Sequence, residues 1–137
     1  MDLHLSHPSS ICEGELQITG SKSQTNRLLL LQALYPQIVI KNGSESDDSL
    51  AMRKALTSDS NLIDVHHAGT AMRFLTAYFA FQKGRNVVLT GSKRMQERPI
   101  KILVEALRSL GAKIEYQNLE GFPPLIINGT DLHKNKV

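Results

Sequence analysis

Three basic turns, each placed just before an apolar helical pattern, hold the residues of this chain best suited to chemistry. They are 20–27 (Gly-Ser-Lys-Ser-Gln-Thr-Asn-Arg), 66–73 (His-His-Ala-Gly-Thr-Ala-Met-Arg) and 91–99 (Gly-Ser-Lys-Arg-Met-Gln-Glu-Arg-Pro). The start of a helix presents free backbone N–H groups and the positive end of the helix dipole, which together favour a bound anion. The turns therefore predict a site for phosphate or carboxylate groups.

The first turn joins a lysine to a helix that begins with hydroxyl residues. Arg27 follows Ser23 at the i,i+4 spacing, so both side chains share one helical face, and Lys22 lies beside the helix start. A Ser-Lys-Ser run before a helix is more often only a cap, and this reading stays open from the turn alone.

The second turn combines close backbone approach with a helix start. Gly69 has no side chain to hinder a ligand, and Thr70 opens the helix. By itself this pattern is most often an ordinary turn with a capping residue.

The third turn places positive charge where a helix disfavours it. Lys93, Arg94 and Arg98 precede a helix N-terminus, and Glu97 between the arginines is expected to organise them. Because these cations and the dipole repel one another, a bound anion would relieve the repulsion. Solvated surface is the competing interpretation.

Other chemistry-bearing residues favour simpler readings. No Cys or carboxylate stands at metal-ligand spacing from His66 and His67, so no metal site is predicted. Asp47 and Asp48 fit acids in the first turn of a helix, and the single Cys12 has no basic neighbour to activate it.

The composition bounds the class of protein. The chain has 137 residues with 41% hydrophobic and 21% charged, which suits one globular domain. A net charge of +3 with 5% aromatic residues does not favour nucleic acid, and no apolar run is long enough for a membrane span. One cysteine excludes an internal disulfide framework, so a cytoplasmic location is expected.

Hydrophobic periodicity predicts an α/β protein with helices covering a sheet. Strands are expected over 11–19, 38–40, 62–65, 86–90, 113–117 and 125–127, and helices over 23–34, 46–56, 70–81 and 99–110. Pro99 suits the first turn of the last helix, and Gly111 suits the position after its end. The Leu run at 28–31 predicts a helix buried nearly all round.

Together these turns resemble the EPSP synthase family of enolpyruvyl transferases. Residues 20–27 are similar to its G-S-K-S-x-[ST]-N-R motif, and 46–48 to its S-[DE]-D segment. Residues 67–73 are similar to N-A-G-T-A-M-R, and 94–100 to R-M-x-E-R-P-I. The order of the motifs agrees, and the resemblance covers nearly the whole chain.

The resemblance implies a fold built of β-α-β-α-β-β units in an inside-out α/β barrel, incomplete here. Residues 1–20 would be a leading strand segment associated with the other domain, and 21–137 a partial N-terminal domain. Family members are two-domain proteins several hundred residues long, so the chain is expected to be an inactive N-terminal fragment. The rest of the enzyme, which carries the general base, would be its partner.

The implied reaction transfers the enolpyruvyl group of phosphoenolpyruvate to the 5-hydroxyl of shikimate 3-phosphate and releases phosphate, with no metal or organic cofactor. Lys22 would contact both substrates and act in catalysis. Ser23 and Arg27 would hold shikimate 3-phosphate.

The resemblance also implies a phosphoenolpyruvate site at His67, Gly69 and Arg98. Five further residues would orient these groups: Asp48, Thr70, Arg73, Arg94 and Glu97.

Three departures from the family pattern stand out. His67 replaces the usual Asn, and Phe74 replaces a common Pro close to the turn that contacts the inhibitor glyphosate. The stretch between Leu56 and His67 is shorter than in many relatives, so a strand or hairpin there is expected to be trimmed.

Two other function classes remain as alternatives. The sister enolpyruvyl transferase acting on UDP-N-acetylglucosamine carries a G-A-K-N-A first motif and a loop Cys, both of which this chain lacks. A non-enzymatic phosphate- or RNA-binding module is motivated by the sequence pI near 9.1.

Overall fold

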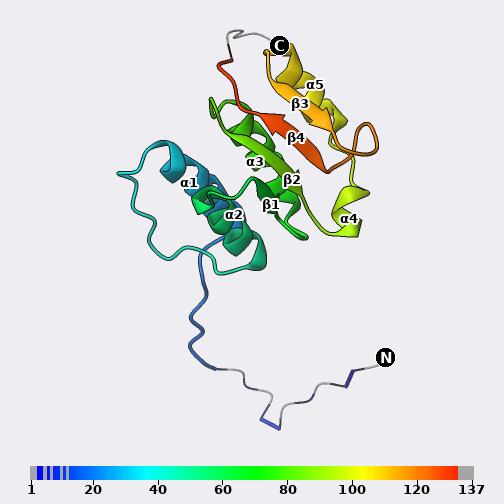
Figure 1. Ribbon diagram of the computed structural model, residues 1–137. Coiled ribbons are helices and arrows are strands. Elements are labelled where there is room, and N and C mark those ends of the chain that lie inside the picture. Colours follow the sequence, from blue (N-terminus) through cyan, green and yellow to red (C-terminus); the bar gives the residue numbers. More distant parts are fainter. Residues whose placement is uncertain (1–2, 5, 7, 10, 12, 133–137) are drawn as a thin grey trace.

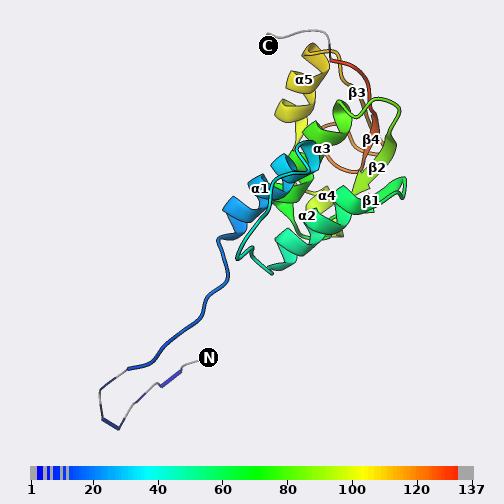
Figure 2. The same ribbon diagram turned by 90° about the vertical axis from the view of Figure 1, so that its left-hand side faces the viewer.

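A four-stranded sheet with helices packed on one side forms the body of the molecule (Figures 1 and 2). The computed structural model describes residues 3–4, 6, 8–9, 11 and 13–132. The helices are α1 (Lys22–Leu34), α2 (Asp47–Thr57), α3 (Gly69–Ala80), α4 (Lys93–Gln96) and α5 (Lys101–Ser109). The strands are β1 (Leu62–Asp64), β2 (Asn86–Thr90), β3 (Lys113–Tyr116) and β4 (Leu125–Asn128).

The sheet and two of the helices make one complete β-α-β-α-β-β unit over 62–128. The strand order is β1-β2-β4-β3, with β1 parallel to β2 and the remaining neighbours antiparallel. Helix α3 connects β1 to β2, and α5 connects β2 to β3. The structure thus confirms the α/β class and the strands and helices expected over this range.

The core lies between the sheet and α3. In β2, the buried residues Val87 and Leu89 alternate with neighbours that are exposed or half-buried, because successive side chains of a strand point to opposite faces. Leu75 and Phe79 of α3 belong to the same buried core. Helices α1 and α2 pack against each other and against α3, so α3 is the central helix of the fold.

Two expected strands are not strands. Residues 38–40 form no strand hydrogen bonds with a neighbouring segment, and Val39 is 77% exposed. The described residues of 11–19 are likewise outside the sheet, with Leu16 89% exposed. Alternating apolar residues make a strand only where a neighbouring strand accepts their hydrogen bonds, and neither segment has one here.

The helix boundaries and burial also correct the sequence predictions. Only Leu29 of the Leu run in α1 is fully buried, because the helix packs on one side alone. Helix α5 begins at Lys101, so Pro99 lies before its first turn. Gly111 follows the end of α5 with φ +105°, as expected for that position.

The leading segment runs away from the body toward the N-terminus (Figures 1 and 2). Its assignment to another domain stays a prediction, and Cys12 lies outside the described residues. Among the described residues, no helix combines the length and apolar character needed to cross a membrane.

Candidate active site

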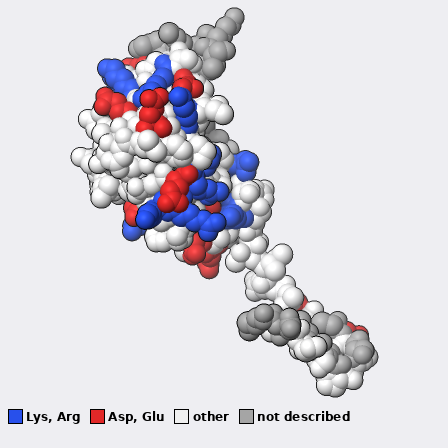
Figure 3. All heavy atoms as spheres, turned by 90° about the vertical axis from the view of Figure 1, so that its right-hand side faces the viewer, with Lys and Arg blue, Asp and Glu red and all other residues white. Residues whose placement is uncertain are grey.

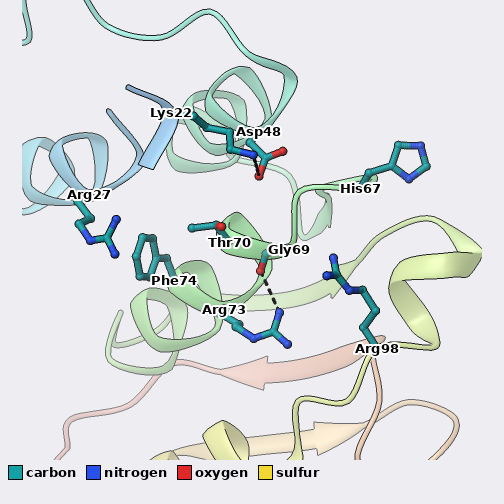
Figure 4. A pocket seen from close by; sticks show the side chains of 9 residues that line it. All are labelled: Lys22, Arg27, Asp48, His67, Gly69, Thr70, Arg73, Phe74 and Arg98. Atoms are coloured by element: carbon teal, nitrogen blue, oxygen red, sulfur yellow. Dashed lines mark hydrogen bonds and ion pairs between the residues drawn. The ribbon is translucent and has the colours of Figure 1, made fainter. Parts of the chain in front are cut away.

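A hollow of about 440 Å³ opens where α1, α2 and α3 meet the turn after α4 (Figure 4). It is lined by Lys22, Arg27, Asp48, His67, Gly69, Thr70, Arg73, Phe74 and Arg98. Four of these side chains are Lys or Arg, and one is a carboxylate. The three turns that the sequence singled out therefore converge on one cationic hollow.

The first turn reaches the hollow because its backbone is anchored beside the loop before α2. Gly20 packs against the Asn42 carbonyl so closely that a side chain there would collide with it. The buried Thr25 hydroxyl accepts a hydrogen bond of 2.9 Å from the Ser44 N–H. These contacts bring α1 and α2 together and place Lys22 near Asp48.

Lys22 and Asp48 form a long ion pair at the rim. Their Nζ and Oδ2 atoms are 3.7 Å apart, with the side chains 50% and 20% exposed. A long pair whose lysine is half exposed is weak, so the Lys22 ammonium remains available to an anion.

Arg27 is oriented by its own helix and by a ring. Its Nη1 donates to the Ser23 carbonyl over 2.9 Å, and its guanidinium lies 5.6 Å from the centre of the Phe74 ring. The i,i+4 relation predicted for Ser23 and Arg27 is therefore present, through the Ser23 backbone. Ser23 does not line the hollow.

The start of α3 supplies backbone donors. The N–H groups of Gly69 and Thr70 have no acceptor among the described residues. A Cβ atom on Gly69 would stand 2.7 Å from Nη1 of Arg98. The absence of a side chain at Gly69 thus allows the Arg98 guanidinium to lie against the helix start, in the arrangement expected for an anion site.

Arg73 fixes this side of the hollow from below. It donates to the carbonyls of Gly69 and Pro99, each over 3.2 Å. One guanidinium therefore ties the first turn of α3 to the segment that carries Arg98. The backbone N–H of Arg98 donates to the Met95 carbonyl over 3.0 Å, while its guanidinium makes no hydrogen bond or ion pair within the described part of the chain.

His67 stands at the rim, and its ring projects away from Lys22 and Asp48 (Figure 4). Its Nδ1 lies 3.0 Å from Oγ of Ser92. The same residue lines a second, adjoining hollow of about 320 Å³ with Arg94, Met95 and Arg98.

The predicted residues divide into those gathered in the larger hollow and three that lie outside it: Ser23, Arg94 and Glu97. Glu97 is exposed and takes part in no ion pair among the described residues, so it does not organise the arginines by direct contact. No group of three or more His, Cys, Asp or Glu in the described ranges could hold a metal ion.

Two residues near the site carried no predicted role. Ser92 pairs with His67 across 25 positions, and its only sequence signal was its place before a helix. Asn26 is fully buried next to Arg27, and its amide has no partner in the described structure. The sequence signal that could have indicated Asn26 is its polar side chain just before the apolar run of α1.

Comparisons with known proteins agree with this arrangement. The family described as EPSP synthase (3-phosphoshikimate 1-carboxyvinyltransferase) matches residues 53–137. A 3-phosphoshikimate 1-carboxyvinyltransferase of Bacteroides fragilis is 50% identical over 134 residues, covering 97% of this chain and 32% of that protein. One from Actinobacillus pleuropneumoniae is 38% identical, covering 95% of this chain and 37% of that protein.

The alignment to the Actinobacillus protein runs over 159 positions, more than the 137 residues of this chain. That relative therefore carries insertions relative to this chain, and the trimming expected between Leu56 and His67 stays a prediction. An EPSP synthase structure from Acinetobacter baumannii shares the fold with a TM-score of 0.70 at 23% identity, over 85% of this chain and 32% of that one.

The chain spans about a third of the length of these curated relatives. The family match extends over most of the chain, and the solved EPSP synthase structure has the same fold over 85% of it. On this evidence the chain belongs to the EPSP synthase family.

Proposed function

We propose that this chain is the N-terminal part of an enzyme that transfers the enolpyruvyl group of phosphoenolpyruvate to the 5-hydroxyl of shikimate 3-phosphate. The observation that carries the proposal is the hollow in which Lys22, Arg27, Arg73 and Arg98 surround the open start of α3. Both proposed substrates are anions, and such a cluster of donors suits them.

The two sides of the hollow suit two substrates. Lys22 and Arg27, with the Ser23 motif residue, would hold shikimate 3-phosphate. Gly69, His67 and Arg98 would hold phosphoenolpyruvate, with Lys22 between the two. Fixing both anions side by side lowers the entropic part of the barrier, and the cations offset charge that develops as the phosphate leaves.

The chain would supply only half of the working site. The general base and the remaining cations would come from the part of the longer protein that lies outside this sequence, and closure on that part would complete the site. We therefore expect substrate binding by this chain to be weak and turnover to be negligible. A cytoplasmic location is proposed because the chemistry uses no disulfide and the sequence has one cysteine.

The test is a two-dimensional NMR titration of the chain with shikimate 3-phosphate. We expect saturable shifts centred on residues 20–27 that disappear in the Lys22→Ala and Arg27→Ala variants. Lys113→Ala is the matched control, because Lys113 is an exposed lysine on β3 outside the hollow. Shifts that persist in both hollow variants would contradict the proposed site.

Competition experiments separate the alternatives. Preference for UDP-N-acetylglucosamine over shikimate 3-phosphate would favour the sister transferase, although the family match and the relatives carry the EPSP synthase description. Steeply salt-dependent RNA binding without a response to shikimate 3-phosphate would favour the binding module. Against it, the face in Figure 3 carries basic groups mixed with acidic ones and no continuous basic stripe.

A further inference from the structure

The contact between His67 and Ser92 joins two of the three turns that form the hollow. The Ser92 N–H donates to the His66 carbonyl over 3.0 Å, and Oγ of Ser92 lies 3.0 Å from Nδ1 of His67. The turn before α3 and the turn before α4 are therefore held together at this point. The side-chain contact leaves Nε2 as the one ring nitrogen of His67 open to a ligand.

The hydroxyl of Ser92 has a second contact that bears on where its proton points. At the start of α4, Oγ accepts a long contact of 3.4 Å from the Met95 N–H, whose shorter bond of 2.8 Å runs to the Ser92 carbonyl. Donation from the hydroxyl to Nδ1 of His67 would then use its proton as well, whereas acceptance from an Nδ1–H would leave that proton without an acceptor among the described residues. A neutral imidazole that accepts at Nδ1 carries its own proton on Nε2.

The position of that proton decides how His67 meets an anion. With the proton on Nε2, the open nitrogen is a donor, and a neutral ring can still bind a phosphate or carboxylate oxygen. With the proton on Nδ1, the open nitrogen presents a lone pair, which repels the same oxygen.

We propose that Ser92 is a positioning residue that holds neutral His67 as the Nε2–H tautomer, so that the ring serves the anion site as a donor. The inference rests on the proposed function in that it takes the ligand to be an anion. It assigns a role to a residue outside the family motifs that the sequence resembles.

The first test reads the tautomer without any ligand. In the chain labelled with ¹⁵N-histidine at pH 8, the ring nitrogen shifts of His67 should report the Nε2–H form. His66 is the internal reference, since its ring contacts His67 and has no hydrogen-bond partner of its own among the described residues. Ser92→Ala should move His67 toward a mixture of tautomers, and Ser92→Thr, which keeps the hydroxyl, should restore it.

The second test measures affinity for inorganic phosphate at pH 8. Ser92→Ala should weaken binding about threefold, the size of one modest hydrogen bond, and Ser92→Thr, which keeps the hydroxyl, should restore it. In the His67→Asn background Ser92→Ala should have no further effect, while in the His66→Asn background, the matched control beside it, the threefold loss should persist. His66 has φ +50°, a conformation that Asn tolerates, so the control preserves the turn.

The outcomes separate this inference from the proposed function. An Nδ1–H ring in the unaltered chain, or a tautomer unchanged by Ser92→Ala, would overturn the positioning role. An equal loss of affinity on Ser92→Ala with His67 present and with His67→Asn would assign Ser92 a structural role instead and would also overturn it. Failure of every form to bind phosphate would contradict the anion site, while the ligand-free spectrum would still decide the role of Ser92.

Discussion

The two walls of the hollow are built in different ways. One wall, formed by Lys22, Arg27 and Asp48 and called here the α1–α2 wall, is held by an exposed ion pair and by a bond within one helix. The other, formed by Gly69, Arg73 and Arg98 and called the α3 wall, is fixed by backbone carbonyls and by the packing of a glycine. The α3 wall is therefore preorganised by the sheet and its core, while the α1–α2 wall depends on side chains in solvent.

The largest expected difference between the two regions is in stability. Leu75 lies in the centre of α3 with no exposed surface, whereas Leu31 of α1 is 43% exposed. Leu75→Ala should lower the free energy of unfolding by about 3 kcal/mol, because the truncation leaves a cavity in a closed core. Leu31→Ala is the matched change and should cost less than about 1 kcal/mol.

Chemical denaturation followed by circular dichroism measures both variants. Equal losses would mean that α1 is as tightly integrated as α3. That result would remove the distinction between the two walls.

A smaller effect is expected at the contact that shapes the α3 wall. Gly69→Ala would place a methyl group 2.7 Å from the present position of Nη1 of Arg98, so the guanidinium must move. Because a side-chain tip moves easily, the fold should keep its stability, while affinity for phosphate should fall about tenfold through a displaced charged donor. A calorimetric titration with phosphate measures the loss.

Gly14→Ala is the control for this substitution, since a Cβ atom there would meet nothing within 4 Å. Unchanged phosphate affinity in Gly69→Ala would show that Arg98 does not need its place against the helix start.

A change of opposite sign is expected in α1, beside the α1–α2 wall. The amide of Asn26 is buried without a partner in the described structure. Asn26→Leu should therefore raise the free energy of unfolding by about 1 kcal/mol, because an unpaired buried amide is replaced by an apolar side chain of similar size. Thermal unfolding measures the gain, and destabilisation would indicate that the amide has a partner in solution, such as a bound water.

The sequence predicted best what depends on neighbours along the chain. The apolar spacing of 70–81 and 99–110 located α3 and α5, and Gly111 marked the end of α5, because helix periodicity and capping are local properties. No strand forms over 38–40 or over the described residues of 11–19, since a strand needs a partner that no local pattern reveals.

The site shows the same division. The three turns were found because each combines basic residues with a helix start, a local pattern, and the structure brings them together in one hollow. The contact of His67 with Ser92 and the buried Asn26 could not be predicted, because they depend on how separate turns and helices pack. Glu97, which was expected to organise the arginines, forms no ion pair with them in the described structure because its side chain remains in solvent.

The smallest predicted effect tests the one carboxylate of the hollow. Asp48 lies 3.7 Å from the Lys22 ammonium and faces the space where an anion would bind. Asp48→Asn should raise affinity for phosphate about twofold at low salt, because a unit charge several ångströms away in water contributes roughly half a kcal/mol of repulsion. Asp47→Asn is the matched control, since Asp47 is the neighbouring acid of the same helix turn and does not line the hollow.

Salt distinguishes this electrostatic effect from a structural one. At about 0.5 M salt the screening length falls well below 10 Å, so the gain from Asp48→Asn should largely disappear. A loss of affinity at every salt concentration would instead mean that Asp48 orients Lys22 toward the ligand. In that case the exposed ion pair would be as important to the α1–α2 wall as the bonds from Arg73 to the Gly69 and Pro99 carbonyls are to the α3 wall.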